Sequence, residues 1–220
     1  MRPSEAAFRG VTAASYAARA ERSVPGLEGL HRMAGVLLGE RVPRDGHVLV
    51  LGAGGGLEIA ALAAMEPGWR FTGVDPSADM IAAAREVCAD VAARVTFFEG
   101  TIGAAPAGPF DGALSLLTFH FIPAEERVAT LVALRQRMRA GAPLVLAHLS
   151  VGAGDLALER HAVLGAGGDR AGAAERLAAM REALHLVAPE EEERMMAAAG
   201  FSEITPFWQA FALRGWVASA

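Results

Sequence analysis

Two features about twenty residues apart could together bind a nucleoside. A glycine-rich loop, residues 52–56, follows the apolar run 48–51 and precedes a stretch with helical spacing. A strand, a glycine turn and a helix bring backbone N–H groups close to a ligand at the helix N-terminus. Asp75 ends a second short strand-like stretch, where its carboxylate can accept hydrogen bonds from the two hydroxyls of a ribose. The pair predicts a domain that binds a nucleoside cofactor.

Two histidines are candidates for chemistry beside such a cofactor. His120 follows the fourth predicted strand, and an imidazole can accept a proton from an O–H or N–H nucleophile near neutral pH. A packed or helix-capping histidine is the alternative. His148 ends the fifth predicted strand, and we expect it to point towards the same cleft and contact substrate. Scattered histidines and a single cysteine, Cys88, predict no metal site and no internal disulfide.

The order of predicted elements determines where these residues meet. Strands are expected at residues 47–51, 70–74, 95–98, 110–116 and 144–149, with helices between them, and at 204–208 and 211–217 near the end of the chain. This alternation predicts an α/β fold: a seven-stranded, mostly parallel sheet with one antiparallel edge strand and helices on both faces. The ligand should lie beyond the carboxyl ends of the parallel strands.

Chain length and local composition predict how the chain is divided into domains. At 220 residues we expect one domain, residues 1–220. Residues 1–45 should form N-terminal cap helices. Residues 152–188 are rich in alanine and read as a helical lid inserted into the domain.

Charge and hydropathy exclude some classes of partner. The net charge is −5 with an isoelectric point near 5.7, which makes a nucleic-acid partner unexpected because such binding rests on cationic side chains. No apolar run approaches the roughly 20 residues that span a bilayer, and the first residues lack the apolar core of a signal peptide. We expect a cytoplasmic protein with a small-molecule substrate and no membrane partner. Whether it forms a homodimer stays open.

The ordered motifs resemble those of class I S-adenosyl-L-methionine (SAM) dependent methyltransferases. They are Val-Leu-Gly-Ala-Gly-Gly-Gly, Gly-Val-Asp-Pro-Ser, Glu-Gly-Thr, Phe-Asp-Gly-Ala and Arg-Ala-Gly-Ala-Pro-Leu-Val-Leu, and the resemblance covers about residues 20–217. It implies a Rossmann-like fold, SAM as cofactor, and methyl transfer to a nucleophile of a small or tRNA-related molecule. The third glycine of the loop comes too early for the Gly-x-Gly-x-x-Gly of an NAD-binding oxidoreductase.

The resemblance implies a set of site residues. Those expected to hold the cofactor are Arg22, Gly52, Ala53, Gly54, Asp75, Pro76, Met80, Gly100, Thr101, Ile102 and Leu116. His120 is the catalytic candidate, and Tyr16, His148 and Arg181 are the substrate candidates. Val50 and Thr101 stand where the family usually has acidic residues, which implies weaker SAM affinity or a modified cofactor. These two positions also favour the alternative of a SAM-binding protein without catalysis.

A closer likeness is to the carboxy-SAM synthases, which make carboxy-SAM from SAM and prephenate for tRNA wobble-uridine modification. It is carried by Arg-Ser-Val-Pro-Gly at 22–26, Phe-His-Phe-Ile-Pro at 119–123, Ala-Gly-Phe at 199–201 and Phe-Trp-Gln-Ala-Phe at 207–211. That family binds a carboxylate through an arginine in the lid. Arg176 and Arg181 lie near its position, in a different sequence context.

Overall fold

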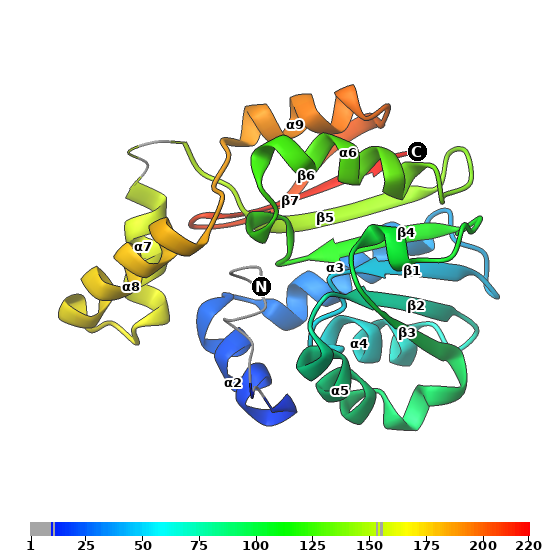
Figure 1. Cartoon of the computed structure of the whole chain (residues 1–220), viewed down its shortest axis with the longest axis horizontal. Coiled ribbons are helices and arrows are strands. Elements are labelled where there is room, and N and C mark those ends of the chain that lie inside the picture. Colours follow the sequence, from blue (N-terminus) through cyan, green and yellow to red (C-terminus); the bar gives the residue numbers. More distant parts are fainter. Residues whose placement is uncertain (1–9, 11, 153, 155) are drawn as a thin grey trace.

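A seven-stranded sheet in the order β3-β2-β1-β4-β5-β7-β6 forms the centre of the molecule (Figure 1). The structure is a computed structural model and describes residues 10, 12–152, 154 and 156–220. The strands are β1 (His47–Leu51), β2 (Arg70–Asp75), β3 (Val95–Glu99), β4 (Gly112–Leu116), β5 (Pro143–Leu149), β6 (Ser202–Ala210) and β7 (Leu213–Ser219).

Strand directions confirm the predicted fold class. β1 to β5 pair in parallel, whereas β7 runs antiparallel to both β5 and β6. The reversed strand is therefore β7, one position inside the edge strand β6. From β1 the chain moves outward through β2 and β3, and then returns to pair β4 on the other side of β1. Such a reversal of strand order creates a crevice at the carboxyl ends of β1 and β4.

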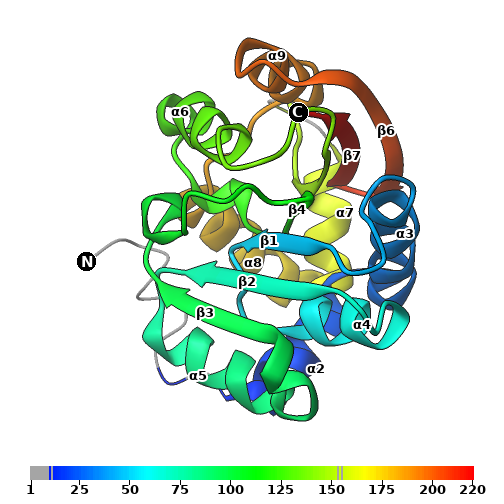
Figure 2. The same ribbon diagram turned by 90° about the vertical axis from the view of Figure 1, so that its right-hand side faces the viewer.

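Two layers of helices cover the sheet because its strands are apolar on both faces (Figure 2). Val48 and Val50 belong to a core cluster with α3 (Leu27–Gly39) and α4 (Leu57–Met65). Leu49 and Leu51 point to the opposite face and belong to a cluster with α6 (Ala124–Arg135) and α9 (Pro189–Ala198). This alternation is the period of two residues that a strand imposes on its side chains.

Three further helices gather near the carboxyl ends of the strands (Figure 1). They are α2 (Ala13–Ser23), α7 (Leu156–Gly165) and α8 (Arg170–Ala183). A third apolar cluster, with Leu149, Leu158, Met180 and Leu213 among its members, ties them to β5 and β7. Of the predicted cap segment only α2 lies here, since α3 packs on the face of the sheet.

Several predicted boundaries differ from the observed ones. The fourth strand begins at Gly112 and not at residue 110. The chain between β2 and β3 forms α5 (Ala78–Val87), followed by the 3₁₀ helix η1 (Ala89–Arg94). Here the Arg94 guanidinium donates to three main-chain carbonyls from the end of α4 to Trp69. Two more 3₁₀ helices, η2 (Ile102–Ala104) and η3 (Phe119–Phe121), follow β3 and β4. Within the described residues no helix is long and apolar enough to cross a membrane.

Candidate functional site

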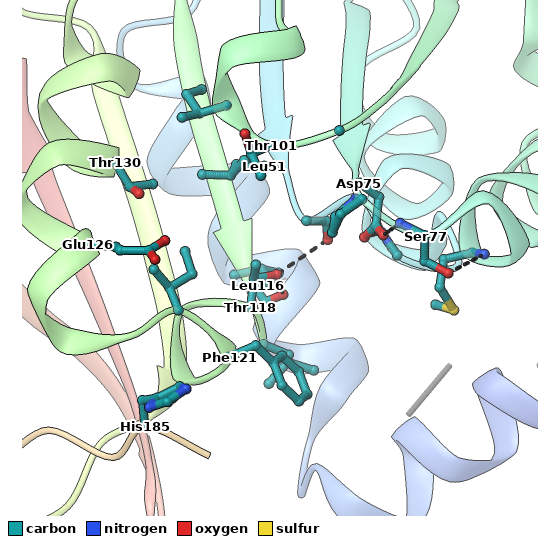
Figure 3. Close-up of a pocket in the computed structure, with 18 of the residues that line it drawn as sticks. Leu51, Asp75, Ser77, Thr101, Leu116, Thr118, Phe121, Glu126, Thr130 and His185 are labelled. Atoms are coloured by element: carbon teal, nitrogen blue, oxygen red, sulfur yellow. Dashed lines mark hydrogen bonds between the residues drawn. The ribbon is translucent and has the colours of Figure 1, made fainter. Parts of the chain in front are cut away.

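A cavity of about 290 Å³ opens at the carboxyl ends of the parallel strands (Figure 3). Its walls come from the loops after β1, β2, β3 and β4, from α2 and α6, and from the segment that follows α8. The lining residues are Tyr16, Leu51, Gly52, Gly54, Asp75, Pro76, Ser77, Met80, Gly100, Thr101, Ile102, Leu116, Leu117, Thr118, Phe121, Ile122, Pro123, Glu126, Thr130, Ala183 and His185.

The glycine loop and Asp75 form one hydrogen-bonded unit. The backbone N–H of Gly54 donates to Asp75 Oδ2 at 2.9 Å, and that of Ser77 donates to Asp75 Oδ1 at 2.9 Å. Gly52 has a φ of 74°, and a Cβ there would collide with the Thr118 hydroxyl. The loop after β1 therefore needs glycine both for its backbone conformation and for the close approach of the loop after β4.

Buried acids lie around this unit. Asp75 is only 9% exposed. The two backbone N–H bonds lower its pKa, but burial has the larger effect, so the pKa of Asp75 is raised. Glu58, in the first turn of α4, is 5% exposed. Burial, with a further contribution from the Asp75 carboxylate, raises the pKa of Glu58 to about 8. Glu58 is therefore largely protonated at neutral pH.

Tyr16 closes the cavity over the glycine loop. A Cβ on Gly54 would lie 3.1 Å from the Tyr16 hydroxyl oxygen. The phenol ring of Tyr16, on α2, therefore packs directly on the loop. Burial is the main cause that raises the pKa of Tyr16, and the nearby acids Glu58 and Asp75 add to it. The phenol is therefore neutral and can donate a hydrogen bond.

An apolar slot lies next to Asp75. Met80, Ile102 and Leu116 are each buried and all line the cavity. The backbone N–H of Met80 is capped by the Ser77 hydroxyl at 3.3 Å, which fixes the start of α5. A flat, largely apolar ring suits this slot. Ten of the predicted site residues line the cavity: Tyr16, Gly52, Gly54, Asp75, Pro76, Met80, Gly100, Thr101, Ile102 and Leu116.

Three other predicted residues do not line the cavity. Ala53 is fully buried beneath the loop, where its Cβ fills the space beside Gly73. Arg22, in the last turn of α2, and Arg181, in the last turn of α8, are exposed on the surface. The prediction that these three side chains face the cofactor or substrate is wrong, because none of them points into the cavity.

The two predicted histidines also point elsewhere. His120 is buried, and its Nδ1 accepts the backbone N–H of Leu149 at 3.3 Å. Burial, followed by His148, Arg127 and His161, lowers the pKa of His120 well below its usual range. His148 is fully buried, its ring stacked on Phe119 and its Nε2 3.6 Å from the Glu192 carboxylate. Neither lines the cavity, so the prediction that both face the cleft is wrong.

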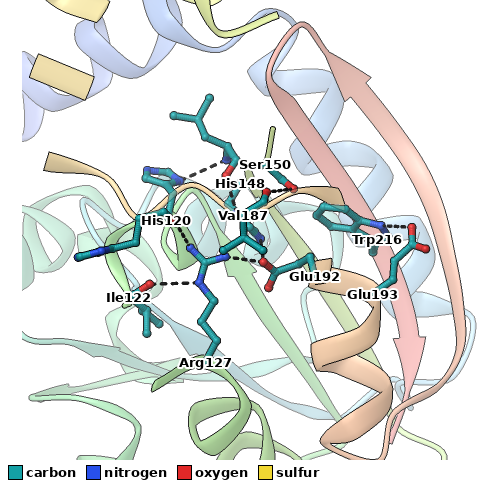
Figure 4. Close-up of polar contacts among 11 residues, drawn as sticks. His120, Ile122, Arg127, His148, Ser150, Val187, Glu192, Glu193 and Trp216 are labelled. Carbon is teal, nitrogen blue, oxygen red and sulfur yellow. Dashed lines mark hydrogen bonds and ion pairs between the residues drawn. The ribbon is translucent and has the colours of Figure 1, made fainter. Parts of the chain in front are cut away.

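His148 lies in a network of buried charges that the sequence reading missed (Figure 4). Arg127 of α6 and Glu192 of α9 form an ion pair in which both side chains are fully buried. Arg127 also donates to the carbonyl oxygens of Ile122, at 3.1 Å, and of His185. The network joins two helices to the segment between α8 and α9.

That segment holds His185 at the wall of the cavity. The backbone N–H of His185 donates to the carbonyl oxygen of His120 at 2.9 Å. Two residues later, the carbonyl oxygen of Val187 accepts from the Ser150 hydroxyl at 2.8 Å. The side chain of His185 is exposed, yet it lines the cavity.

The cavity thus has a second polar end. Figure 3 shows Glu126, Thr130 and His185 across the cavity from Asp75 and Ser77. Glu126 and Thr130 are four residues apart on α6 and so share one face of that helix. That spacing was legible in the sequence, but nothing there indicated which face of the helix meets the cleft. Among the described residues no group of three or more His, Cys, Asp or Glu side chains could hold a metal ion.

Comparisons with known proteins agree with this geometry. Residues 48–141 match the family model described as "Methyltransferase domain". The carboxy-S-adenosyl-L-methionine synthase of Dichelobacter nodosus is 28% identical over 213 residues, which are 94% of this chain and 89% of that protein. The same enzyme of Chromohalobacter salexigens is 34% identical over 131 residues, 57% of this chain and 48% of that protein.

A solved structure shows the same fold. The Haemonchus contortus phosphoethanolamine N-methyltransferase 2 in complex with SAM superposes with a TM-score of 0.70 at 18% identity, over 94% of this chain and 46% of that one. This chain thus spans about half the length of that larger structure. Residues 48–141 thus match a methyltransferase domain, and the chain has the fold of a SAM-dependent methyltransferase.

Proposed function

We propose that the chain transfers the methyl group of SAM to a small molecule that enters the cavity from the side of α6. One observation carries the proposal. A single continuous cavity joins the glycine loop and Asp75 to a second polar end at Glu126, Thr130 and His185. A nucleoside at the first end and an acceptor at the second would share one enclosed space, which direct transfer between two ligands requires.

The residues at the first end fit SAM. Asp75 presents carboxylate oxygens to a ribose, and Met80, Ile102 and Leu116 form an apolar slot suited to adenine. A side chain on Gly54 would approach Tyr16 and Met80, so glycine keeps room beside the loop for the amino acid part. Bound SAM supplies a methyl group on a sulfonium, which is already electrophilic. The chain then has to position the acceptor, exclude water and receive a proton where the nucleophile carries one.

His185 replaces His120 as the candidate for receiving that proton. Its imidazole lines the cavity, whereas His120 is enclosed by β5 and η3 and bonded to the Leu149 N–H. Because the backbone of His185 is held by both its N–H and its carbonyl oxygen, the ring has a defined place beside an acceptor.

The test is a titration followed by an assay for product. Calorimetric titration of the purified full chain with SAM should give saturable binding, and no binding at millimolar SAM would overturn the proposal. Incubation with methyl-labelled SAM and a panel of small phenols, amines and alcohols should then release S-adenosylhomocysteine. Binding without turnover on any panel member would favour a SAM-binding protein without catalysis.

A second candidate is a carboxy-SAM synthase, which the two curated relatives favour. Its anionic substrate needs a cationic partner at the cavity. The two arginines considered from the sequence do not supply it, since Arg181 is exposed and Arg176 donates to the Ser23 hydroxyl at 3.0 Å. Mass spectrometry of nucleosides extracted from purified protein separates the candidates. Carboxy-SAM in the extract would favour the synthase, and SAM or S-adenosylhomocysteine alone would count against it.

A further inference from the structure

We propose that the outer face of α7 binds a second copy of this chain, so that two copies associate about a two-fold axis parallel to that helix. The outer face and Phe211 line a groove of about 660 Å³. Among the described residues, none that lines this groove also lines the cavity of the candidate site. Figure 1 shows α7 and α8 at one end of the molecule. The outer face consists of Leu156, Glu159, Arg160, Val163 and Leu164.

The two sides of α7 differ in what covers them. On the inner side Leu158 and Ala162 are buried in the apolar cluster shared with α8, β5 and β7. On the outer side Leu156 is 55% exposed. Leu156 and Phe211 are among the large apolar side chains that are exposed in the described part of the chain, and both line the groove. Exposed apolar surface that is gathered in one place is typical of a protein–protein contact.

Phe211 has a backbone conformation that its side chain does not favour. It is the first residue of the two-residue turn between β6 and β7, and its φ is 51°. Glycine or asparagine is preferred at such a position, because a bulky side chain there costs free energy. The ring is 43% exposed, so burial within the chain offsets little of that cost. A partner in the groove would bury the ring.

The charges of the outer face match a second copy of the same face. Leu156 and Val163 are seven residues apart and lie on nearly one line along the helix. Glu159 and Arg160 lie on opposite sides of this line, because successive residues of a helix are rotated by about 100°. Among the described residues neither of them has an ion-pair partner. Both charges can therefore pair with another molecule.

A two-fold axis parallel to α7 pairs these charges twice. Leu156 and Val163 then meet their own counterparts, and Glu159 of each copy faces Arg160 of the other. An axis perpendicular to α7 would instead bring the two Glu159 flanks together and the two Arg160 flanks together. A partner of uniform charge would match only one flank. Arg170, which also lines the groove, belongs to α8 and lies beyond the end of α7.

The contact is short, so the association should be weak. α7 has ten residues, which is about 15 Å of helix. Small interfaces are typical of weak and transient complexes. We expect a dissociation constant of roughly 10–100 μM.

Sedimentation equilibrium of the full chain measures this association. From about 5 μM to about 500 μM the average mass should rise from that of a monomer towards that of a dimer. Leu156→Glu should stay monomeric over this range. Val36→Glu is the matched control and should dimerise like the wild type, because Val36 is 62% exposed on another helix, α3. A monomeric wild type, a dimeric Leu156→Glu variant or a monomeric control would each overturn the proposal.

Charge variants show whether the partner is a second copy of the same face. Glu159→Arg makes both flanks positive, and Arg160→Glu makes both negative, so each variant alone should associate at least about tenfold more weakly than the wild type. An equimolar mixture of the two should dimerise, because each variant supplies the charge that the other lacks. A mixture that associates no more tightly than the single variants would contradict the pairing of Glu159 with Arg160.

Disulfide trapping tests the direction of the two helices. In the parallel arrangement Leu156 meets its own counterpart, so Leu156→Cys should form a disulfide-linked dimer on mild oxidation. The native Cys88 is buried, and Val36→Cys is the control that should stay uncrosslinked. A Leu156→Cys variant that forms disulfide-linked dimers no faster than Val36→Cys would overturn the parallel arrangement.

Phe211→Asn separates the contact from the fold. Asparagine tolerates a positive φ, so urea unfolding of the monomer at low concentration should show equal or higher stability than the wild type. Association should be weaker, because the ring is lost from the groove. A variant that unfolds as the wild type does and associates with the same dissociation constant would exclude Phe211 from the contact.

Discussion

The backbone N–H of Gly54 donates a 2.9 Å hydrogen bond to Oδ2 of Asp75, across 21 residues of sequence. The other carboxylate oxygen accepts the N–H of Ser77 at 2.9 Å. One buried side chain thus fixes the loop after β1 and the turn after β2, the two segments that we assign to the cofactor. Asp75 is both a wall of the cavity and part of its framework.

Asp75→Ala should therefore weaken the fold as well as cofactor binding. The structure leaves two buried N–H groups without acceptors in this variant, each costing about 1–3 kcal/mol. Urea unfolding should show that loss, and SAM titration should show reduced affinity. Asp90→Ala, an exposed aspartate in η1, is the control and should change neither. Unchanged unfolding of Asp75→Ala would contradict the framework role.

Glu58→Gln should stabilise the protein above neutral pH. The pKa of Glu58 is raised to about 8 in the fold, above the ordinary value of 4.5 for a glutamate. Proton uptake then favours the folded state, so the wild type loses stability as pH rises from about 4.5 to 8. Removing the titrating group should raise the free energy of unfolding by roughly 2 kcal/mol or more at pH 8, and by much less at pH 5.

Glu28→Gln is the matched control for this measurement. Glu28 and Glu58 each occupy the second position of a helix that follows a left-handed glycine, but Glu28 is exposed. In urea unfolding, the difference in unfolding free energy between Glu28→Gln and the wild type should be the same at pH 5 and at pH 8, because the control variant keeps Glu58. A Glu58→Gln variant with the same stability difference at pH 5 and pH 8 would show that Glu58 does not titrate in this range.

The sequence predicted the part of the site that depends on backbone topology. The carboxyl ends of neighbouring parallel strands meet at one edge, so the glycine loop and Asp75 could be placed together from strand order alone. Apolar runs such as residues 48–51 also indicated strands buried on both faces. Local composition and chain order suffice for such features.

The direction in which individual side chains point could not be predicted from chain order in the same way. His148 follows Leu144 and Leu146 at a spacing of two, so it shares their face beneath α6 and α9 and not the cleft. The Arg127–Glu192 pair joins residues 65 apart, and an arginine in a helix gives no sign in the sequence that it is buried. His185 lies at the cavity because its backbone is hydrogen-bonded to residues far away in the chain.

Two buried histidines should make stability fall in mild acid. Burial lowers the pKa of His31 and of His161 to about 4, and Arg176 contributes at His161. Between about pH 6.5 and 4 the unfolded chain binds more protons, so the free energy of unfolding falls with pH by up to about 1.4 kcal/mol per unit for each histidine.

His161→Gln keeps a polar side chain and removes the titration. The difference in unfolding free energy between pH 7.5 and pH 5 should shrink by about 2 kcal/mol, measured by urea unfolding at both values. His31→Gln should have a similar effect. Because α3 and α7 are separate elements, the double variant should show the sum. An undiminished pH dependence in both single variants would assign the acid sensitivity to other groups.

Breaking the buried pair of Arg127 and Glu192 should cost far more than the loss of a surface ion pair. Arg127→Met leaves a buried carboxylate and two carbonyl oxygens without their donor, and Glu192→Met leaves a buried guanidinium without its counter-charge. Each should lower the free energy of unfolding by about 3–5 kcal/mol. The double variant should lose much less than the sum, because no uncompensated charge remains.

The pair Glu191–Arg194 on α9 is the control, since its side chains are 38% and 71% exposed. The same cycle of methionine variants there should give a coupling energy below about 1 kcal/mol. In the Arg127→Met variant the carbonyl oxygen of His185 also loses its donor. A coupling energy between Arg127 and Glu192 no larger than that of the surface pair would mean that their mutual attraction does not stabilise the fold. In that case the fixed place of His185 at the wall of the cavity would rest on its backbone bond to His120 alone.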